Sequence, residues 1–480
     1  MWITALAILY ILVLVIVCFR IIMYTDTPSK GLAYLLLVIT FPVVGVVFYL
    51  SVGLNYRKQK LYQKKIEIDE NAFPELQQDI QNYAEQVLQN NKKALGEIFP
   101  LFKTDFIRNL VSDNNKVTLL INGEEKFPDL MQALHKAEHH IHIEYYIYED
   151  DNIGKQIIDI LIQKARQGVE VRFIYDDFGS RISKETILKM RQANIEAFPF
   201  YKINIIQFAN RINYRNHRKI VVIDGNTGYV GGINVSDKYI NNTQQNKLYW
   251  RDTHLKIQGG AALNLQFVFL TDWNFCANQQ IAFSQKYFPE ESLRSNFGKS
   301  IVQVIPSGPD SDYPNTMYSL IQAVMAAKKD LRITTPYFIP DKSFLDAVKI
   351  AALSGVNVCL LIPGISDSFI VNTTSQSYYE ELLNAGVRIF KYEKGFVHAK
   401  TLVCDDTLSI VGTANLDNRS FDLNFEINAV VFDRELSTLL IAQYERDLLV
   451  AEEISISAWK QRAGYKKMIE KTLHLISPLM

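Results

Sequence analysis

Two stretches of this 480-residue chain carry the same reactive side chains at the same intervals. Each holds a histidine, a lysine two residues later, an aspartate seven residues after the histidine and an asparagine seventeen residues after it (234 − 217 and 415 − 398). The two sets are His217, Lys219, Asp224 and Asn234, and His398, Lys400, Asp405 and Asn415. Identical spacing in two places indicates an internal repeat that carries a site.

The residue types indicate chemistry at a phosphate diester. An imidazole can attack phosphorus or protonate a leaving oxygen near neutral pH, and a lysine ammonium can neutralise phosphate oxygens. Residues two apart in a strand share a face, so each histidine is expected to point with its lysine into one cleft. A pseudo-twofold axis would bring both pairs to one phosphate, with one histidine as nucleophile and the other as acid, through a phosphohistidine.

Neither a metal nor a cofactor is predicted, because the lysines supply the charge that Mg²⁺ gives in other phosphoryl transfers. One metal alternative is the set His140, His142 and Glu144 on a single strand face, but no fourth ligand is evident. Asp224 and Asp405 belong to the reactive motifs, yet they have the opposite strand parity and are expected to brace the site without touching substrate.

The charge distribution favours an anionic substrate that is met locally. The 51 basic and 51 acidic residues give a formal net charge of zero, which argues against a nucleic-acid binder held by bulk charge. No acidic residue lies between Glu196 and Asp224, where the basic residues are Lys202, Arg211, Arg215, Arg218 and Lys219. A neutral chain can therefore present a positive cleft.

The elements around these motifs read as an α/β fold. Strands are expected at 117–122, 141–148, 169–175 and 195–198, and helices at 127–138, 153–167 and 184–192. Similar helix, glycine and strand passages recur at 165–171 and 352–358. We therefore expect two related halves, 113–290 and 291–480, after a helical linker at 55–112.

The first 54 residues predict a membrane hairpin of two transmembrane helices. Residues 2–19 are apolar apart from Thr4, and residues 32–50 carry no charge, so each approaches the roughly 20 residues that span a bilayer. The basic residues that follow are Arg57, Lys58, Lys60, Lys64 and Lys65. By the positive-inside rule they place the long remaining part of the chain in the cytoplasm.

With these features the sequence resembles the phospholipase D superfamily, whose signature is a doubled HxKxxxxD motif, and within it the bacterial cardiolipin synthases. Further stretches that carry the resemblance are Phe41-Pro-Val-Val-Gly45, Glu144-Tyr-Tyr-Ile147, Arg215-Asn-His-Arg-Lys219, Trp250-Arg-Asp252, Pro306-Ser-Gly-Pro309, Thr335-Pro-Tyr-Phe338 and Arg419-Ser-Phe421. The resemblance implies two pseudo-twofold related α/β/α sandwich halves in one catalytic unit. It also implies a multi-pass enzyme of the bacterial cell membrane that converts two phosphatidylglycerol molecules to cardiolipin and glycerol.

The resemblance also implies individual roles. His217 matches the family's nucleophile and His398 the acid that later acts as base, while Asn234 and Asn415 match positions that hold phosphate oxygens. Glu426 matches a carboxylate that orients a catalytic imidazole. Asp252 is its counterpart in the first half, although it lies 35 residues after its histidine (252 − 217) and Glu426 only 28 (426 − 398).

Two alternatives remain open at this point. A hydrolase of the same superfamily, a phospholipase or less favourably a nuclease, would use the same phosphohistidine with water as acceptor. A scaffold that has lost activity would retain only the fold, but both histidines and both lysines are intact. The motifs do not report how water is kept from the second step.

Overall fold

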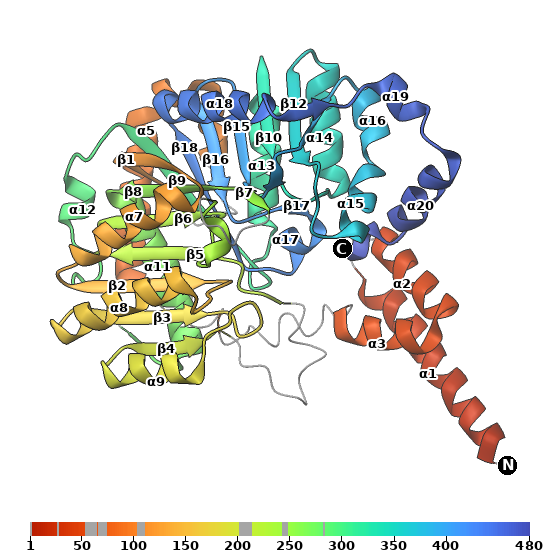
Figure 1. Ribbon diagram of the computed structural model, residues 1–480, viewed down its shortest axis with the longest axis horizontal. Coiled ribbons are helices and arrows are strands. Elements are labelled where there is room, and N and C mark those ends of the chain that lie inside the picture. The colour runs from red at the N-terminus through yellow and green to blue at the C-terminus, as the bar shows by residue number, and fades with distance from the viewer. Residues whose placement is uncertain are drawn as a thin grey trace.

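The computed structural model describes residues 2–25, 28–52, 65, 74–102, 111–200, 214–241, 248–281 and 284–480 (Figure 1). The expected cluster of basic residues at 57–64 and the basic residues Lys202 and Arg211 lie outside these ranges. The helical linker that was expected contains α5 (Pro74–Leu95), followed by η1 (Gly96–Ile98) and α6 (Phe99–Phe102).

Among the described residues, fifteen strands form one continuous sheet whose two parts repeat the same strand order. The first part runs β1 (Val111–Ile121), β8 (Thr253–Gln258), β6 (Thr227–Gly231), β5 (Lys219–Ile223), β2 (His140–Tyr145), β3 (Glu170–Tyr175), β4 (Glu196–Pro199). The second runs β9 (Ser300–Ser307), β18 (Glu426–Phe432), β16 (Leu408–Gly412), β15 (Thr401–Cys404), β10 (Asp330–Thr334), β12 (Asn357–Pro363), β13 (Arg388–Tyr392), and ends with β19 (Ala451–Glu453). This matches the α/β repeat expected from the sequence.

Strand β1 joins the two parts. Its C-terminal portion pairs antiparallel with β8, Lys116 lying opposite Gln258, while its N-terminal portion pairs antiparallel with β9, Val111 lying opposite Gln303. The adjacent central strands β1 and β9 are equivalent members of the two parts, and they run in opposite directions. That arrangement is what a twofold axis through the middle of a sheet requires.

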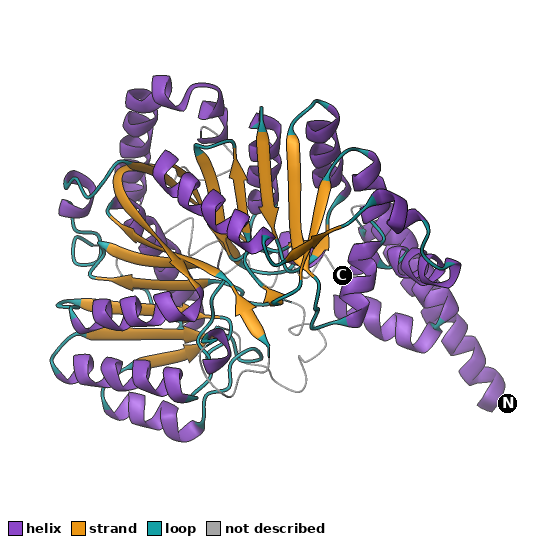
Figure 2. Ribbon diagram, turned by 45° about the horizontal axis from the view of Figure 1, so that its top comes forward, coloured by secondary structure: helices purple, strands orange, loops and turns teal. Residues whose placement is uncertain are grey.

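Helices cover both faces of each half, which makes each a three-layer sandwich (Figure 2). In the first half these are α7 (Asn122–His135), α8 (Asn152–Arg166) and α9 (Lys184–Gln192) on one face and α11 (Gly260–Cys276) on the other. In the second half the counterparts are α13 (Asn315–Ala326), α14 (Lys342–Leu353) and α16 (Tyr379–Asn384) opposite α18 (Arg434–Leu448). Helix α11 is buried over nearly its whole length, and its side chains share one core with α18 and strands of both halves.

Shorter elements complete the two halves. They are η3 (Asp237–Tyr239), β7 (Tyr249–Arg251), α12 (Glu291–Arg294), β11 (Phe338–Ile339), α15 (Phe369–Gln376), β14 (Gly395–Val397), β17 (Leu416–Asp417), α17 (Asn418–Asp422), α19 (Ile456–Lys460), α20 (Gly464–His474) and η4 (Ser477–Leu479). β7 of the first half pairs in parallel with β14 of the second. A short ladder therefore ties the halves together beside the main sheet.

The N-terminal apolar region differs from the expected hairpin. Helix α1 (Trp2–Tyr24) extends the first predicted span, but the second predicted span is wrong as a single helix, because it divides into α2 (Pro28–Thr40) and α3 (Pro42–Val52). Pro42 cannot donate a helical hydrogen bond and disfavours helical backbone before it. A Cβ on Gly45 would lie 2.6 Å from the Leu37 carbonyl oxygen, so glycine lets α3 fold back against α2. Within the described part of the chain, no helix has both the length and the apolar character needed to cross a membrane.

The motif aspartates brace equivalent turns at the end of the sheet away from the histidines. Asp224 accepts hydrogen bonds from the backbone N–H groups of Glu138, His139 and His140, at 2.8 to 2.9 Å. Asp405 accepts from three backbone N–H groups at 2.9 to 3.2 Å, those of Lys328, Lys329 and Asp330. Both aspartates have left-handed backbone, with φ of 52° and 51°. Each carboxylate thus fixes the turn that leads into the strand beside its own motif strand.

Replacing Asp405 by Ala should lower the free energy of unfolding by about 2 kcal/mol, because three N–H groups lose their acceptor and alanine tolerates left-handed backbone poorly. Asp406→Ala is the matched control, since Asp406 is exposed and pairs only at the surface with Arg434. Its effect should stay within about 0.5 kcal/mol. Denaturant unfolding of both variants measures the difference, and equal losses would contradict the bracing role.

Candidate active site

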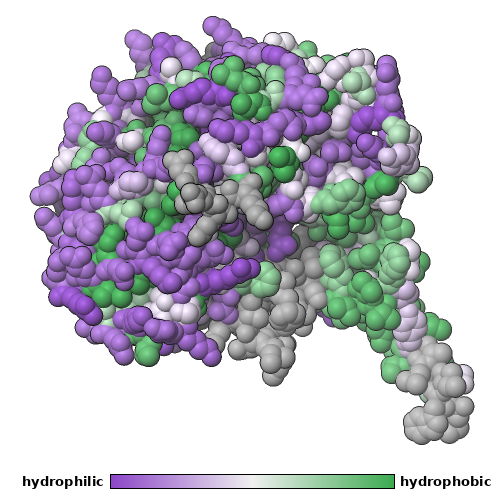
Figure 3. Space-filling model, in the orientation of Figure 1, coloured by the Kyte–Doolittle hydropathy of each residue, from purple (hydrophilic) through white to green (hydrophobic). Residues whose placement is uncertain are grey.

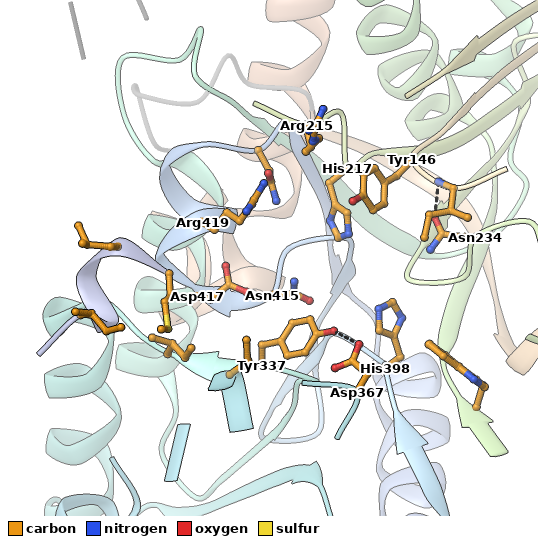
Figure 4. Close-up of a pocket in the computed structure, with 18 of the residues that line it drawn as sticks. Tyr146, Arg215, His217, Asn234, Tyr337, Asp367, His398, Asn415, Asp417 and Arg419 are labelled. Carbon is orange, nitrogen blue, oxygen red and sulfur yellow. Dashed lines mark hydrogen bonds between the residues drawn. The ribbon is translucent and has the colours of Figure 1, made fainter. Parts of the chain in front are cut away.

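A cavity of about 650 Å³ opens where the two halves and the N-terminal helices meet (Figure 4). Its polar lining includes both motif histidines and both motif asparagines. The other polar and aromatic residues that line it are Tyr146, Arg215, Lys238, Tyr239, Trp250, Tyr337, Asp367, Asp417, Arg419 and Asn424. Its remaining lining is apolar and comes from Ile147, from α2, α3, β11 and α15, and from the segment around η4.

The backbone of each histidine is held by the opposite half. The N–H of His217 donates to the carbonyl oxygen of Phe425 at 2.9 Å, and the N–H of His398 donates to that of Arg251 at 2.7 Å. The histidines lie just before β5 and β15, and not within a strand as strict alternation would predict. They therefore reach the cavity from the ends of the strands, while the apolar residues that follow fill the sheet.

The carboxylates that orient the imidazoles are exchanged between the halves. Nδ1 of His217 lies 2.9 Å from each carboxylate oxygen of Glu426, and Nδ1 of His398 lies 2.7 Å from Oδ2 of Asp252. Each carboxylate directly follows the residue whose carbonyl holds the same histidine. Because a carboxylate only accepts hydrogen bonds, Nδ1 carries the proton and Nε2 keeps its lone pair.

The two carboxylates are supported differently, which breaks the symmetry of the site. Glu426 accepts hydrogen bonds from the Thr413 hydroxyl at 2.5 Å and the Asn424 amide at 3.2 Å. The position equivalent to Thr413 is Gly232, fifteen residues after its histidine in each case (413 − 398 and 232 − 217). A Cβ on Gly232 would lie 2.1 Å from Oδ1 of Asp252, so only glycine leaves that carboxylate in place.

The motif lysines lie buried behind the histidines. Nζ of Lys219 donates to the carbonyl oxygen of His217 at 2.6 Å, and Nζ of Lys400 donates in the same way to His398 at 2.5 Å. Both lysines are at most 5% exposed. The spacing predicted that each lysine would point with its histidine into the cleft, but the histidines line the cavity and the lysines do not. Each lysine instead lies buried against the backbone of its own histidine, because its Nζ is held by that carbonyl oxygen.

The motif asparagines line the cavity from opposite sides. Asn234 is fixed, since its Oδ1 accepts from the Ile147 N–H at 3.1 Å and its Nδ2 donates to the Tyr239 hydroxyl at 2.7 Å. Asn415 is 7% exposed, and its backbone N–H donates to the Ser420 hydroxyl. Figure 4 shows the two side chains on either side of the histidines.

Burial favours the neutral form of both imidazoles. Burial lowers the pKa of His217 to about 4, although Glu426 opposes the shift. Burial, aided by the Lys400 ammonium, lowers the pKa of His398 to about 3. Burial alone would raise the pKa of Asp252, but His398 and then Lys400 lower it overall. Two unprotonated Nε2 atoms therefore face the cavity.

The lysine ammonium groups are also destabilised by burial. Burial lowers the pKa of Lys219 to about 7, against the opposing charge of Glu426. Burial lowers the pKa of Lys400 to about 8, against Asp252 and Glu426. Each lysine also lowers the pKa of the histidines near it. The site thus concentrates positive charge that an anion would stabilise.

Several residues of the site were not predicted from the sequence, two of which, Tyr146 and Trp250, line the cavity. The ring of Tyr146 packs edge-on against His217 at 4.8 Å, and the ring of Trp250 packs against His398 at 5.5 Å. Both residues belong to stretches that carry the family resemblance. Their position in those stretches was the sequence feature that could have indicated a role at the site. Thr413 and Gly232 could have been found by aligning the two repeats, because they occupy the same offset.

The histidines that suggested a metal belong instead to a buried hydrogen-bond network. Gln266 links them, since its Oε1 lies 3.0 Å from Nε2 of His140 and its Nε2 lies 2.7 Å from Nδ1 of His142. Nε2 of His142 lies 3.2 Å from the Arg172 guanidinium. Across the residues the structure describes, no group of three potential ligands could hold a metal ion.

Comparison with known proteins places this site in a family. The family model described as cardiolipin synthase, PLD-like domain, matches residues 130–264 and 320–448, one match in each half. The cardiolipin synthase of Alkalihalophilus pseudofirmus is 42% identical over 94% of this chain and 89% of its own length. The major cardiolipin synthase ClsA of Bacillus subtilis is 38% identical over 98% of each chain.

A solved structure extends the likeness to the fold. The crystal structure of phosphatidylserine synthase from Haemophilus influenzae matches with a TM-score of 0.58 and 12% identity, and the match covers 76% of this chain and 95% of that one. At that identity the likeness concerns the fold alone. The two relatives and the family model span both motif-bearing halves. The chain therefore belongs to the cardiolipin synthases of the phospholipase D superfamily and is a phosphatidyltransferase.

Proposed function

We propose that this enzyme transfers a phosphatidyl group from one phosphatidylglycerol to another through a phosphohistidine on His217, releasing glycerol and forming cardiolipin. The observation that carries the proposal is the exchange of carboxylates, which turns two neutral imidazoles toward one cavity with Nε2 unprotonated. The family supplies the reaction, and the site supplies the groups that the reaction needs.

In the first half-reaction, Nε2 of His217 attacks the phosphorus of the donor lipid. The new P–N bond replaces the P–O bond to the glycerol headgroup, and His398 gives its proton to the departing oxygen. Burial favours the neutral form of His398, because it lowers the pKa of this imidazole. The bound phosphate favours the imidazolium, so His398 acquires its proton together with the substrate.

In the second half-reaction, the acceptor lipid takes the place of glycerol. His398, now neutral, removes the proton from a headgroup hydroxyl of the second phosphatidylglycerol as that oxygen attacks phosphorus and the P–N bond breaks. Glu426 stabilises the positive charge that develops on His217 during the first attack, as Asp252 does for His398. The buried Lys219 and Lys400 supply positive charge near the phosphate, and the two motif asparagines, which line the cavity, hold its oxygens.

We further propose that helices α1 to α3 lie in the bacterial cell membrane, with the catalytic halves on its cytoplasmic side. Figure 3 shows apolar side chains gathered over these helices beside a largely hydrophilic body. Side chains that are at least half exposed there include Ile8, Leu12, Val15, Phe19, Ile22, Leu32, Ile39, Val43 and Val44. The basic residues at 57–65 favour the cytoplasmic face, whose lipids are anionic.

The enzyme in detergent micelles containing phosphatidylglycerol should form cardiolipin and glycerol in equal amounts. His217→Ala should reduce this rate at least about a thousandfold, because the nucleophile is gone. Lipid chromatography separates cardiolipin from phosphatidic acid. Predominant phosphatidic acid from the unmodified enzyme would instead identify a hydrolase that uses water as acceptor.

The assignment of the nucleophile can be tested by trapping the intermediate. A phosphatidyl donor with a p-nitrophenol leaving group needs no acid, so His398→Asn should accumulate a phosphatidyl adduct on His217. His217→Asn is the matched variant and should accumulate none. Mass spectrometry of the peptides locates the adduct, and an adduct on His398 in His217→Asn would reverse the assignment.

The rate should fall as the pH rises, because the two lysines lose their charge in the free enzyme. Their pKa values are lowered to about 7 and about 8, so both are ammonium below this range and neutral above it. We expect kcat/KM to decline as pH rises through about 7 to 8, since this parameter reports the free enzyme. At saturating lipid the decline in kcat should move to higher pH, because bound phosphate stabilises the ammonium groups. A constant kcat/KM to pH 9 would contradict this.

A further inference from the structure

The catalytic cavity has a second, apolar end that the chemistry does not use. Its lining there comes from Leu37 of α2, Val44 and Phe48 of α3, and Ile476, Leu479 and Met480 around η4. We propose that this end holds an acyl chain of the lipid whose phosphate lies at the histidines. This inference rests on the proposed function, because it deepens the description of the same substrate.

Specific hydrogen bonds, an ion pair and apolar packing hold the segments that form the apolar end. η4 is fixed to the second half, since the Asn418 amide donates to the Ser477 carbonyl oxygen at 3.1 Å and the Tyr378 hydroxyl to the Ser477 hydroxyl at 2.7 Å. Leu479 packs against the cluster that joins α1, α2 and α3. Lys30, near the start of α2, forms an ion pair with Asp422 of α17.

A short segment of the second half connects the polar end of the cavity to its apolar end. Asn415 lines the polar end, and helix α17, which begins three residues later, contacts η4 through Asn418. The apolar wall is therefore continuous with the catalytic cavity and not a separate surface patch. The cavity volume of about 650 Å³ falls within the usual range for small-ligand sites, so the cavity can take more than a phosphate and a glycerol.

The break between α2 and α3 gives this end its position. Helix α3 folds back at Pro42, so that Val44 and Phe48 of α3 line the cavity together with Leu37 of α2. Both helices therefore contribute to the cavity wall. Other side chains of α2 and α3 are apolar and exposed at the surface. A lipid in contact with this surface could move its phosphate to the histidines while its chain stays in apolar surroundings. The apolar wall then orients the acyl chain but adds no hydrophobic binding energy. The reason is that lipid tails already surround the acyl chain in the bilayer.

Adjacent valines of α3 provide a matched test. Val44 lines the cavity, whereas Val43 does not, yet their exposed fractions are 65% and 69%. Val44→Trp should fill the apolar end, and Leu479→Trp should fill it from the opposite wall. The full-length enzyme would be assayed in detergent with dioleoyl-phosphatidylglycerol and with short-chain dihexanoyl-phosphatidylglycerol. The ratio of kcat/KM for the long-chain lipid to that for the short-chain lipid should fall at least about tenfold in both variants.

Val43→Trp should leave this ratio unchanged. The inference would be overturned if Val44→Trp and Leu479→Trp kept the ratio of the unmodified enzyme, or if Val43→Trp lowered it equally. Because the readout is a ratio within one protein, a partly folded variant still reports it. If the unmodified enzyme formed no cardiolipin from either lipid, the proposed function would fail first, which is a distinguishable result.

Discussion

The contact between each motif imidazole and a carboxylate of the other half is the interaction on which the site depends. It sets the tautomer of His217 and His398, and it requires the two sandwiches to meet in one relative position. The backbone bonds beside it use the residues that immediately precede Glu426 and Asp252, so side chain and main chain are aligned by the same short segments. The shared strand β1 and the common core of α11 and α18 hold the halves in that position.

Burial gives the site its chemical character. The same desolvation that keeps the imidazoles unprotonated also weakens the charge of the lysines behind them. A phosphate group has the charge to relieve both effects, since a nearby negative charge stabilises an ammonium group and raises the pKa of an imidazole. The cavity thus favours an anion, although the chain as a whole has no net charge.

The sequence predicted the parts of this molecule that repeat. The alternation of strands and helices and the doubled motif followed from periodicity and spacing. Which carboxylate serves which histidine could not be predicted, because Glu426 and Asp252 are each closer in sequence to the histidine they do not contact. The division of the second apolar segment was missed because hydropathy counts apolar residues and does not weigh the backbone restriction at Pro42.

The exchanged contacts also mean that the site around His217 can form only after the second half of the chain has been synthesised. Glu426 lies 209 residues after His217, so the first half leaves the ribosome with a histidine whose acceptor does not yet exist. Its imidazole then has neither its fixed tautomer nor its fixed direction. Until the second half has been made and has docked, the first half carries a histidine without the contact that fixes its tautomer.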